Sequence, residues 1–484
     1  MVSSVVHFFD VTMELSEILK SDGELLRQRQ IYALVLRLGV PAILAQLASV
    51  AMQYIDAAMV GSLGASASAS IGVVTSSTWI VIGLSYAVAM GFSVQIAHAI
   101  GANDTAQAKK VFCEGLVICC LTACLLCFIG INLSPYLPSL MGAEQKIQHD
   151  ASAYFFIYSC AIPAMLLRVF SVNVLQCAGN TKIPSILNSL LCVLDICFNY
   201  FLIFPTRELT VGNFSFTIFG AGLGVAGAAL GTAFAEVIIA IAMFIAAFRM
   251  PNLSFDSISL KFSKGILETA GKISGPMALE SVVMNGAYIV ITSIVAPLGA
   301  VSLAADIFGF ITEQVCYLPG FGICIATTTL VGQALGANRK VHARKFAWSA
   351  VKCGVLIVTI TAIAMYFFAP VIFGWLTPDA AVQELGVKIL RIELLSEPLF
   401  AASTIIVGAL RGAKDTFIPS MFTLIGEWFV LIPLALFLVK DFGLVGVWIG
   451  ICANFCIRGV FFLLRLRNEK SWLKVAKTND ENIN

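Results

Sequence analysis

Charged residues are scarce in this sequence. Asp, Glu, Lys and Arg make up 12% of its 484 residues, whereas soluble proteins carry about 25%. So few charges cannot cover a soluble surface, and a formal net charge of +2 gives no basis for binding nucleic acid. The composition predicts a protein that lies in a lipid bilayer and has no nucleic-acid partner.

Histidine is also scarce, which bears on enzymatic function. The chain has four histidines, His7, His98, His149 and His342, and no two have the spacing of a paired metal site. No nucleophile–base motif accompanies them. A membrane-embedded enzyme is therefore a weak alternative, and we expect no cofactor.

Cysteine is plentiful, but its positions do not indicate a disulfide framework. Nearly all of the 14 cysteines fall within apolar segments. Cys124-Leu125-Leu126-Cys127 has the spacing of redox and zinc motifs, which depend on a context that an apolar segment lacks. We expect the cysteines to pack as small apolar side chains, with no structural metal.

Long apolar runs are abundant. Hydrophobic residues make up 59% of the chain, and a helix needs about 20 apolar residues to cross a bilayer. We predict an all-α membrane protein with 12 transmembrane helices. The expected spans are 39–64, 71–98, 111–134, 151–175, 183–205, 220–248, 274–296, 301–333, 348–373, 384–409, 418–439 and 443–466.

The sequence also contains an internal repeat, in which the second half matches the first. Punctuating residues recur at an offset of 235 positions, as from Pro41 to Pro276, and apolar bias alone does not align Pro, Gly and Asn. The other matching landmarks are Leu63-Gly64-Ala65 with Leu298-Gly299-Ala300, Gly101-Ala102-Asn103 with Gly336-Ala337-Asn338, and Pro163 with Pro398. Such repeats are typical of secondary transporters. We therefore expect two homologous six-helix lobes.

The repeat gives the domain boundaries. The predicted parts are an N-terminal segment 1–38, a first lobe 39–248, an amphipathic linker 249–273, a second lobe 274–466 and a tail 467–484. The N-terminal segment lacks the apolar core of a signal peptide, so the first helix is expected to be retained. The first lobe has extra residues near 205–220, where alternating polarity predicts a short hairpin.

Basic residues predict the orientation. Lys and Arg concentrate in the cytoplasmic loops of membrane proteins, and the loops after the first and seventh helices contain neither. We expect a multi-pass protein of the plasma (inner) membrane with the N-terminal segment, the linker and the tail in the cytoplasm.

Ionisable residues inside the predicted spans are the candidate functional groups, because each costs about 2.5–3.5 kcal/mol to insert. Asp56 and Asp195 lie about 12 and 15 Å below the outer ends of their helices, and Thr232 lies at a similar depth. Two carboxylates in one apolar pocket need a bound proton or a metal ion. Their repeat mates are Ile291 and Val430, so these acids are not part of the shared scaffold.

The second half has acids of its own. Glu280, Asp306, Glu313 and Glu397 lie within its spans, at positions where the first half has no acid. Four further ionisable residues in spans are Arg168, Glu236, Glu393 and Glu427. Both halves therefore supply candidates for a cation site.

These features resemble the multidrug and toxic compound extrusion (MATE) family over about residues 39–466. The residues that carry the resemblance are Pro41, the segment Tyr54–Gly64 with Asp56 within it, Gly101-Ala102-Asn103, Gly336-Ala337-Asn338 and Leu410–Thr416. The resemblance implies two six-helix lobes forming a V about a pseudo-two-fold axis. It also implies antiport, in which amphipathic organic cations leave while H⁺ or Na⁺ enters.

Within that family the chain looks most like the DNA-damage-inducible branch, whose coupling site lies in the first lobe. Asp56, Asp195 and Thr232 match that branch's site, and Pro41 matches the proline at which the first helix bends. The Asn expected one turn before the second acid is replaced by Leu191. Asn188 and Asn199 flank this position and are the remaining amide candidates.

The expected function is secondary active efflux of amphipathic, cationic compounds by a monomer, in exchange for H⁺ or Na⁺. The expected lining is apolar and aromatic, which suits organic cations. Candidate lining residues are Gln53, Trp79, Tyr86, Phe92, Arg168, Tyr288 and Phe310. The alternative is a flippase for a lipid-linked saccharide, which would need a basic cavity, whereas Arg168 is nearly alone at depth.

Overall fold

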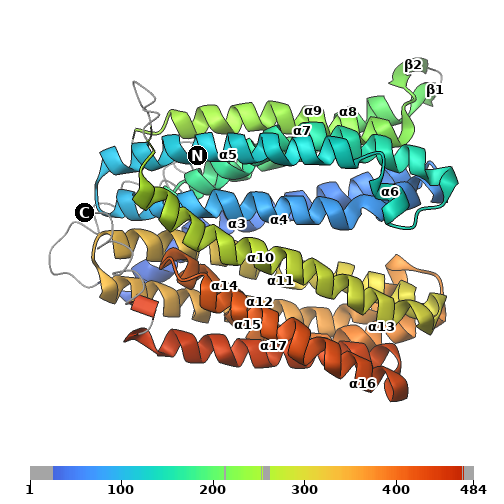
Figure 1. Ribbon diagram of the computed structural model, residues 1–484. Coiled ribbons are helices and arrows are strands. Elements are labelled where there is room, and N and C mark those ends of the chain that lie inside the picture. The colour runs from blue at the N-terminus through green and yellow to red at the C-terminus, as the bar shows by residue number, and fades with distance from the viewer. Residues whose placement is uncertain (1–25, 212–213, 252, 254–261, 471, 474–484) are drawn as a thin grey trace.

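Long helices make up most of the computed structural model, which describes residues 26–211, 214–251, 253, 262–470 and 472–473 (Figure 1). The first half contains α3 (Gln28–Gly61), α4 (Ala65–Gly101), α5 (Thr105–Leu133), α6 (Leu137–Leu140), α7 (Gln145–Cys177), α8 (Lys182–Ile203), β1 (Pro205–Val211), β2 (Phe214–Ala221) and α9 (Gly224–Phe248). The second half contains α10 (Lys264–Val295), η1 (Ala296–Leu298), α11 (Ala300–Gly336), α12 (Lys340–Leu376), α13 (Ala380–Glu393), α14 (Glu397–Gly412), α15 (Phe417–Ile425), η2 (Gly426–Leu431), α16 (Ile432–Phe442) and α17 (Leu444–Arg467).

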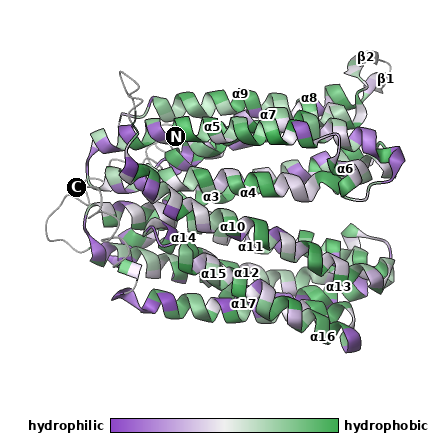
Figure 2. Cartoon of the chain, in the orientation of Figure 1, coloured by the Kyte–Doolittle hydropathy of each residue, from purple (hydrophilic) through white to green (hydrophobic). Residues whose placement is uncertain are grey.

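The prediction of 12 spans is confirmed. Among the described residues, 11 helices are long and apolar enough to cross a membrane, and the bent pair α13–α14 raises the number to 12. The two parts of that pair meet at an angle of 56°. The bend coincides with Pro398 in the first turn of α14, whose ring nitrogen cannot donate to the preceding turn. Figure 2 shows that hydrophobic residues occupy most of the length of such helices.

The helices form two lobes, as predicted (Figure 1). The ribbons of the lobes are close where α4 and α11 end, and they diverge toward the end that carries the β1–β2 hairpin. The lobes touch mainly through α3 against α11 and α4 against α10. Gly322 makes the first contact close, because a Cβ there would lie 2.7 Å from the Ile43 backbone nitrogen.

Helix α3 belongs to both lobes. Its first turns pack into a core built mainly by the second lobe, through the buried residues Ile31, Leu34 and Leu38. Its last turns pack against the first-lobe helices, where Val60 lies in a cluster with Ile203. Pro41 is buried between these two regions. A change at one end of α3 is therefore placed to act on both lobes.

The extra residues of the first half form the predicted hairpin. β1 pairs antiparallel with β2, with Leu209 opposite Phe216 and Val211 opposite Phe214. The two residues between the strands lie outside the described part of the chain. Glycine is required where the hairpin returns, since a Cβ on Gly220 would lie 2.2 Å from the Phe204 carbonyl oxygen.

Several helices extend beyond their predicted limits, and the starts of α3 and α10 do so by the most. α3 begins at Gln28, within the predicted N-terminal segment 1–38, and α10 begins at Lys264, within the predicted linker 249–273. α10 starts early because Ile266 is buried in the first-lobe core. Most of the N-terminal segment (1–25), residues 252 and 254–261 of the linker, and 471 and 474–484 of the tail lie outside the described residues.

Candidate functional site

Asp56, Asp195 and Asn199 meet in the first lobe. The Asn199 side-chain amide donates to Asp56 Oδ1 at 2.9 Å and to Asp195 Oδ2 at 3.0 Å. Asp195 and Asn199 are fully buried, whereas Asp56 is partly exposed. The Thr232 side chain lies against the Asp195 carboxyl group. The structure thus brings together four residues that the sequence singled out.

The pocket depends on the close packing of α3, α8 and α9. Asp195 and Asn199 are four residues apart, so both face the same side of α8. Gly231 of α9 lets that face approach, because a Cβ there would lie 2.1 Å from Asn199 Oδ1. Asp56 comes from the last two turns of α3. The acids are therefore supplied by two different helices and held by one amide.

Two oxygens of this pocket have no hydrogen-bond partner among the described residues. They are Asp195 Oδ1 and Asn199 Oδ1, and both are buried. A buried polar atom without a partner costs about 1–3 kcal/mol. Carboxylate, amide and hydroxyl oxygens are also the ligands that hard cations take. The pocket can accept a proton between its acids or a small cation among its oxygens.

Asn188 and Arg168 lie in a different contact. Arg168 of α7 binds Glu236 of α9 through two hydrogen bonds of 2.6 and 2.9 Å, and its third nitrogen lies 3.4 Å from Asn188 Oδ1. Asn188 therefore pairs with the arginine rather than with Asp195. This ion pair was missed from the sequence, because it depends on how α7 and α9 are rotated about their axes.

The second lobe contains a buried cluster of three acids, Glu313, Glu393 and Glu397. One carboxylate oxygen from each lies within 4.8 Å of the others. Glu313 Oε2, Glu393 Oε2 and both oxygens of Glu397 are buried and without a hydrogen-bond partner among the described residues. The sequence identifies Glu393 as an ionisable residue within a span but does not assign it to the site. The four-residue spacing from Glu393 to Glu397, across the bend, is the signal that could have found it.

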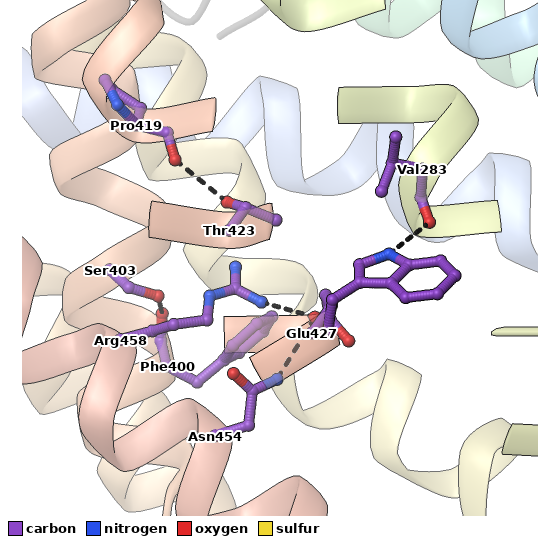
Figure 3. Close-up of polar contacts among 9 residues, drawn as sticks. Val283, Phe400, Ser403, Pro419, Thr423, Glu427, Asn454 and Arg458 are labelled. Atoms are coloured by element: carbon purple, nitrogen blue, oxygen red, sulfur yellow. Dashed lines mark hydrogen bonds and ion pairs between the residues drawn. The ribbon is translucent and has the colours of Figure 1, made fainter. Parts of the chain in front are cut away.

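The other second-lobe acids are each engaged separately. Glu280 accepts from the Ser420 hydroxyl at 2.7 Å, and Asp306 accepts from Trp448 Nε1 at 2.8 Å. Glu427 of η2 accepts from Arg458 at 2.8 Å and from Asn454 at 3.2 Å, as Figure 3 shows. The structure therefore divides the predicted second-lobe set, and only Glu313 and Glu397 lie in one cluster.

The predicted lining residues also fall into separate contacts. Trp79 of α4 stacks on Tyr288 of α10 with ring centroids 6.4 Å apart, and Tyr288 meets Phe310 edge-on at 5.8 Å. Trp79 and Tyr288 are about half exposed. Tyr86 faces the guanidinium of Arg411 from the other lobe at 5.8 Å.

Two lining predictions fare differently. Gln53 is exposed on α3, which is compatible with a lining position. Phe92 is 2% exposed and packs in the first-lobe core against Gly115 of α5. The prediction for Phe92 is therefore wrong, since its side of α4 faces inward to neighbouring helices.

Comparison with known proteins shows which family the chain is similar to. The MatE family model matches residues 41–201 and 276–437, one match in each lobe. The probable multidrug resistance protein NorM of Thermotoga maritima is 26% identical over 466 residues, covering 93% of this chain and 95% of the relative. The protein of the same description from Listeria innocua is 25% identical over 444 residues, covering 91% and 95%.

Solved structures show the same fold. A mutant of the Vibrio cholerae MATE transporter VcmN has a TM-score of 0.83 and 20% identity, with 91% of this chain and 97% of that chain covered. A multidrug resistance MATE family transporter in an outward-facing conformation has a TM-score of 0.84 and 20% identity, with 93% and 100% covered. At this identity the likeness extends to the fold and not to particular site residues.

Proposed function

This chain belongs to the MatE family, a family of multi-pass membrane transporters, and on that premise we propose that it is a multidrug efflux transporter that exports amphipathic organic cations in exchange for H⁺ or Na⁺. The Asp56–Asn199–Asp195 pocket is the proposed coupling site. The observation that carries this assignment is a pair of acids from two helices, bridged by one amide, with buried oxygens left over for a ligand.

Cation uptake at this pocket is the proposed driving event. Two nearby carboxylates repel each other unless a proton or cation lies between them. Asp56 is part of α3, whose other end is packed in the core of the second lobe. Neutralising Asp56 therefore changes the forces on a helix that both lobes hold. Pro41 weakens the helix between these ends, because it cannot donate a backbone hydrogen bond.

Coupling then follows from thermodynamic linkage. If a bound cation disfavours the substrate-bound state by a given free energy, bound substrate disfavours the cation by the same amount. The proposed substrate surface includes the Trp79–Tyr288 stack, which joins the lobes and offers two aromatic faces. Aromatic faces attract organic cations by about 0.5–2 kcal/mol each.

The flippase alternative is less well supported. A carrier of a lipid-linked saccharide would need unpaired positive charge at depth for its phosphates. Arg168 is the basic residue that the sequence placed there, and its charge is offset by Glu236. Under the proposed function the chain termini lie in the cytoplasm, as the distribution of Lys and Arg indicates.

The test is transport of a fluorescent organic cation by the full chain in proteoliposomes under an imposed pH gradient or an imposed Na⁺ gradient. Asp195→Asn should abolish gradient-driven transport, and Glu280→Gln, in a separate contact of the second lobe, serves as the matched control. The gradient that drives the wild type identifies the ion. Equal transport by wild type and Asp195→Asn would move the coupling site to the second lobe. Absence of transport by the wild type would favour the flippase.

A further inference from the structure

Two buried hydrogen bonds join the lobes at the end of the molecule where α4 and α11 finish. His98 Nε2 of α4 lies 2.8 Å from the carbonyl oxygen of Gly412, the last residue of α14. Gln333 Nε2 of α11 donates at 2.8 Å to the carbonyl oxygen of Cys177, the last residue of α7. Each bond runs from one lobe to the other. Because a carbonyl oxygen only accepts, the His98 ring carries its hydrogen on Nε2.

The two bonds are one contact repeated. The offset of the internal repeat carries His98 to Gln333 and Cys177 to Gly412, so donors and acceptors are both equivalent. The acceptors are also alike in chemistry, since the last four carbonyl groups of a helix have no partner within that helix. Each lobe thus uses a side chain at the end of one helix to satisfy a helix end in the other lobe.

The backbones of α4 and α11 touch at the same place. A Cβ on Gly101 would lie 2.0 Å from the carbonyl oxygen of Gln333, and a Cβ on Gly336 would lie 2.0 Å from the carbonyl oxygen of His98. These glycines are also repeat mates. The two hydrogen-bond donors, His98 and Gln333, are therefore also the residues whose backbones contact the glycines of the other lobe. The contact between the lobes therefore follows the two-fold symmetry of the internal repeat.

One departure from the symmetry adds to the contact. The Thr329 hydroxyl of α11 donates to the Gln176 carbonyl of α7 at 2.9 Å. The repeat mate of Thr329 is Val94, which has no hydroxyl group. Among the described residues, the Gln333 side therefore has one more inter-lobe hydrogen bond than the His98 side.

We propose that His98–Gly412 and Gln333–Cys177 form a latch that holds the two lobes together at this end and releases when the lobes change orientation. The inference rests on the proposed function in one respect, since a transporter must open each end in turn. The end concerned is cytoplasmic in the proposed orientation. Release exchanges the two buried hydrogen bonds for hydrogen bonds to water. The latch therefore favours the closed state only modestly, which allows it to release.

The test uses Cys177 as a native reporter. Its side chain is 3% exposed and its carbonyl is part of the latch. The full chain in liposomes is treated with a maleimide, and labelling of each cysteine is measured by peptide mass spectrometry. We expect His98→Ala combined with Gln333→Ala to raise the rate of Cys177 labelling at least threefold. His98→Gln should label as the wild type does, because Gln serves in the equivalent position.

Two controls separate the latch from general loosening. Asn173→Ala removes an equally buried amide of α7 whose side chain, among the described residues, donates to Val169 of the same helix, and it should leave Cys177 labelling unchanged. Cys119, 1% exposed in the first-lobe core, reports unfolding. Should the double variant unfold, His98→Ala is compared with His98→Gln.

Equal labelling of Cys177 in wild type and the folded double variant, or in that single-variant pair, overturns the latch. Labelling does not depend on transport, so a wild type that fails to move the organic cation contradicts the proposed function and leaves this result readable.

Discussion

Asp56 on α3 and Asn199 on α8 are joined by a hydrogen bond of 2.9 Å across 143 positions of sequence. The same amide holds Asp195, so removing it should separate the two acids from their shared partner. A hydrogen bond to a charged group contributes about 1.5–3 kcal/mol. We predict that Asn199→Ala changes the affinity for the coupling cation by about 10-fold to 100-fold, measured by titration of the purified protein. The affinity should fall if the pocket binds Na⁺, because the Asn199 Oδ1 ligand is lost, and rise if it binds a proton, because the donated hydrogen bonds favour the unprotonated acids.

The control for this variant is Asn188→Ala. Asn188 lies on the same helix but contacts Arg168, so cation binding should stay within about twofold of the wild type. Equal changes in both variants would show that the effect comes from α8 as a whole and not from the acid pocket.

Gly231 should be required for the packing of α9 on α8. A Cβ there would lie 2.1 Å from Asn199 Oδ1 and 2.9 Å from the Asn199 backbone nitrogen, and the backbone atom cannot swing aside. Overpacking of this kind costs about 1–3 kcal/mol. Gly231→Ala should therefore lower the thermal unfolding temperature, whereas Gly271→Ala, where a Cβ meets nothing within 4 Å, should not. An unchanged unfolding temperature for Gly231→Ala would contradict the packing described for this site.

The Trp79–Tyr288 stack should contribute to substrate affinity. Loss of one aromatic face removes about 0.5–2 kcal/mol of cation–π attraction, so Trp79→Ala should weaken binding of an organic cation by about 2-fold to 30-fold in a fluorescence titration. Trp375→Ala removes a tryptophan that is 84% exposed in the second lobe and should have no effect. Matching affinities for Trp79→Ala and the wild type would place the substrate away from this stack.

Mutation of the Glu313–Glu393–Glu397 cluster is expected to stabilise the protein, in contrast to the changes above. Three buried acids within 4.8 Å of one another oppose folding unless a ligand offsets them. Glu397→Gln keeps the shape and removes one ionisable group, so we expect the unfolding temperature to rise by a few degrees. Glu384→Gln, on the exposed face of α13, is the control and should change little. The opposite result would identify a cation bound at the cluster. In that case Glu397→Gln would unfold at a lower temperature than the wild type, and the difference would disappear once cations are removed from the wild type.

Much of the fold could be predicted because helix ends are local. Gly101 and its repeat mate Gly336 mark the same point in both lobes, and the structure ends α4 and α11 at these residues. Pro41 and its repeat mate Pro276 also correspond, but they lie inside the continuous helices α3 and α10. The start of α10 could not be found in this way. It depends on burial of Ile266 against the other lobe, which no local pattern reports.

The candidate site was predictable in depth but not in partners. Counting residues along each helix brought Asp56, Asp195 and Thr232 to one level, and the structure brings them together. Asn199 is not at the amide position that the family resemblance implies, but a spacing of four residues puts it on the same face of α8 as Asp195. The pairing of Arg168 with Glu236 depends on the rotation of two helices about their axes, which the sequence does not specify.

The most direct test of the central claim measures competition between cation and substrate at equilibrium. Purified full-length protein is titrated with a fluorescent organic cation at several proton and Na⁺ concentrations, for the wild type and Asp195→Asn. Coupling through the acid pocket predicts that one of the two ions weakens substrate binding to the wild type by about 5-fold or more. The variant should bind substrate with an affinity independent of that ion. The same ion dependence in both proteins would contradict the account.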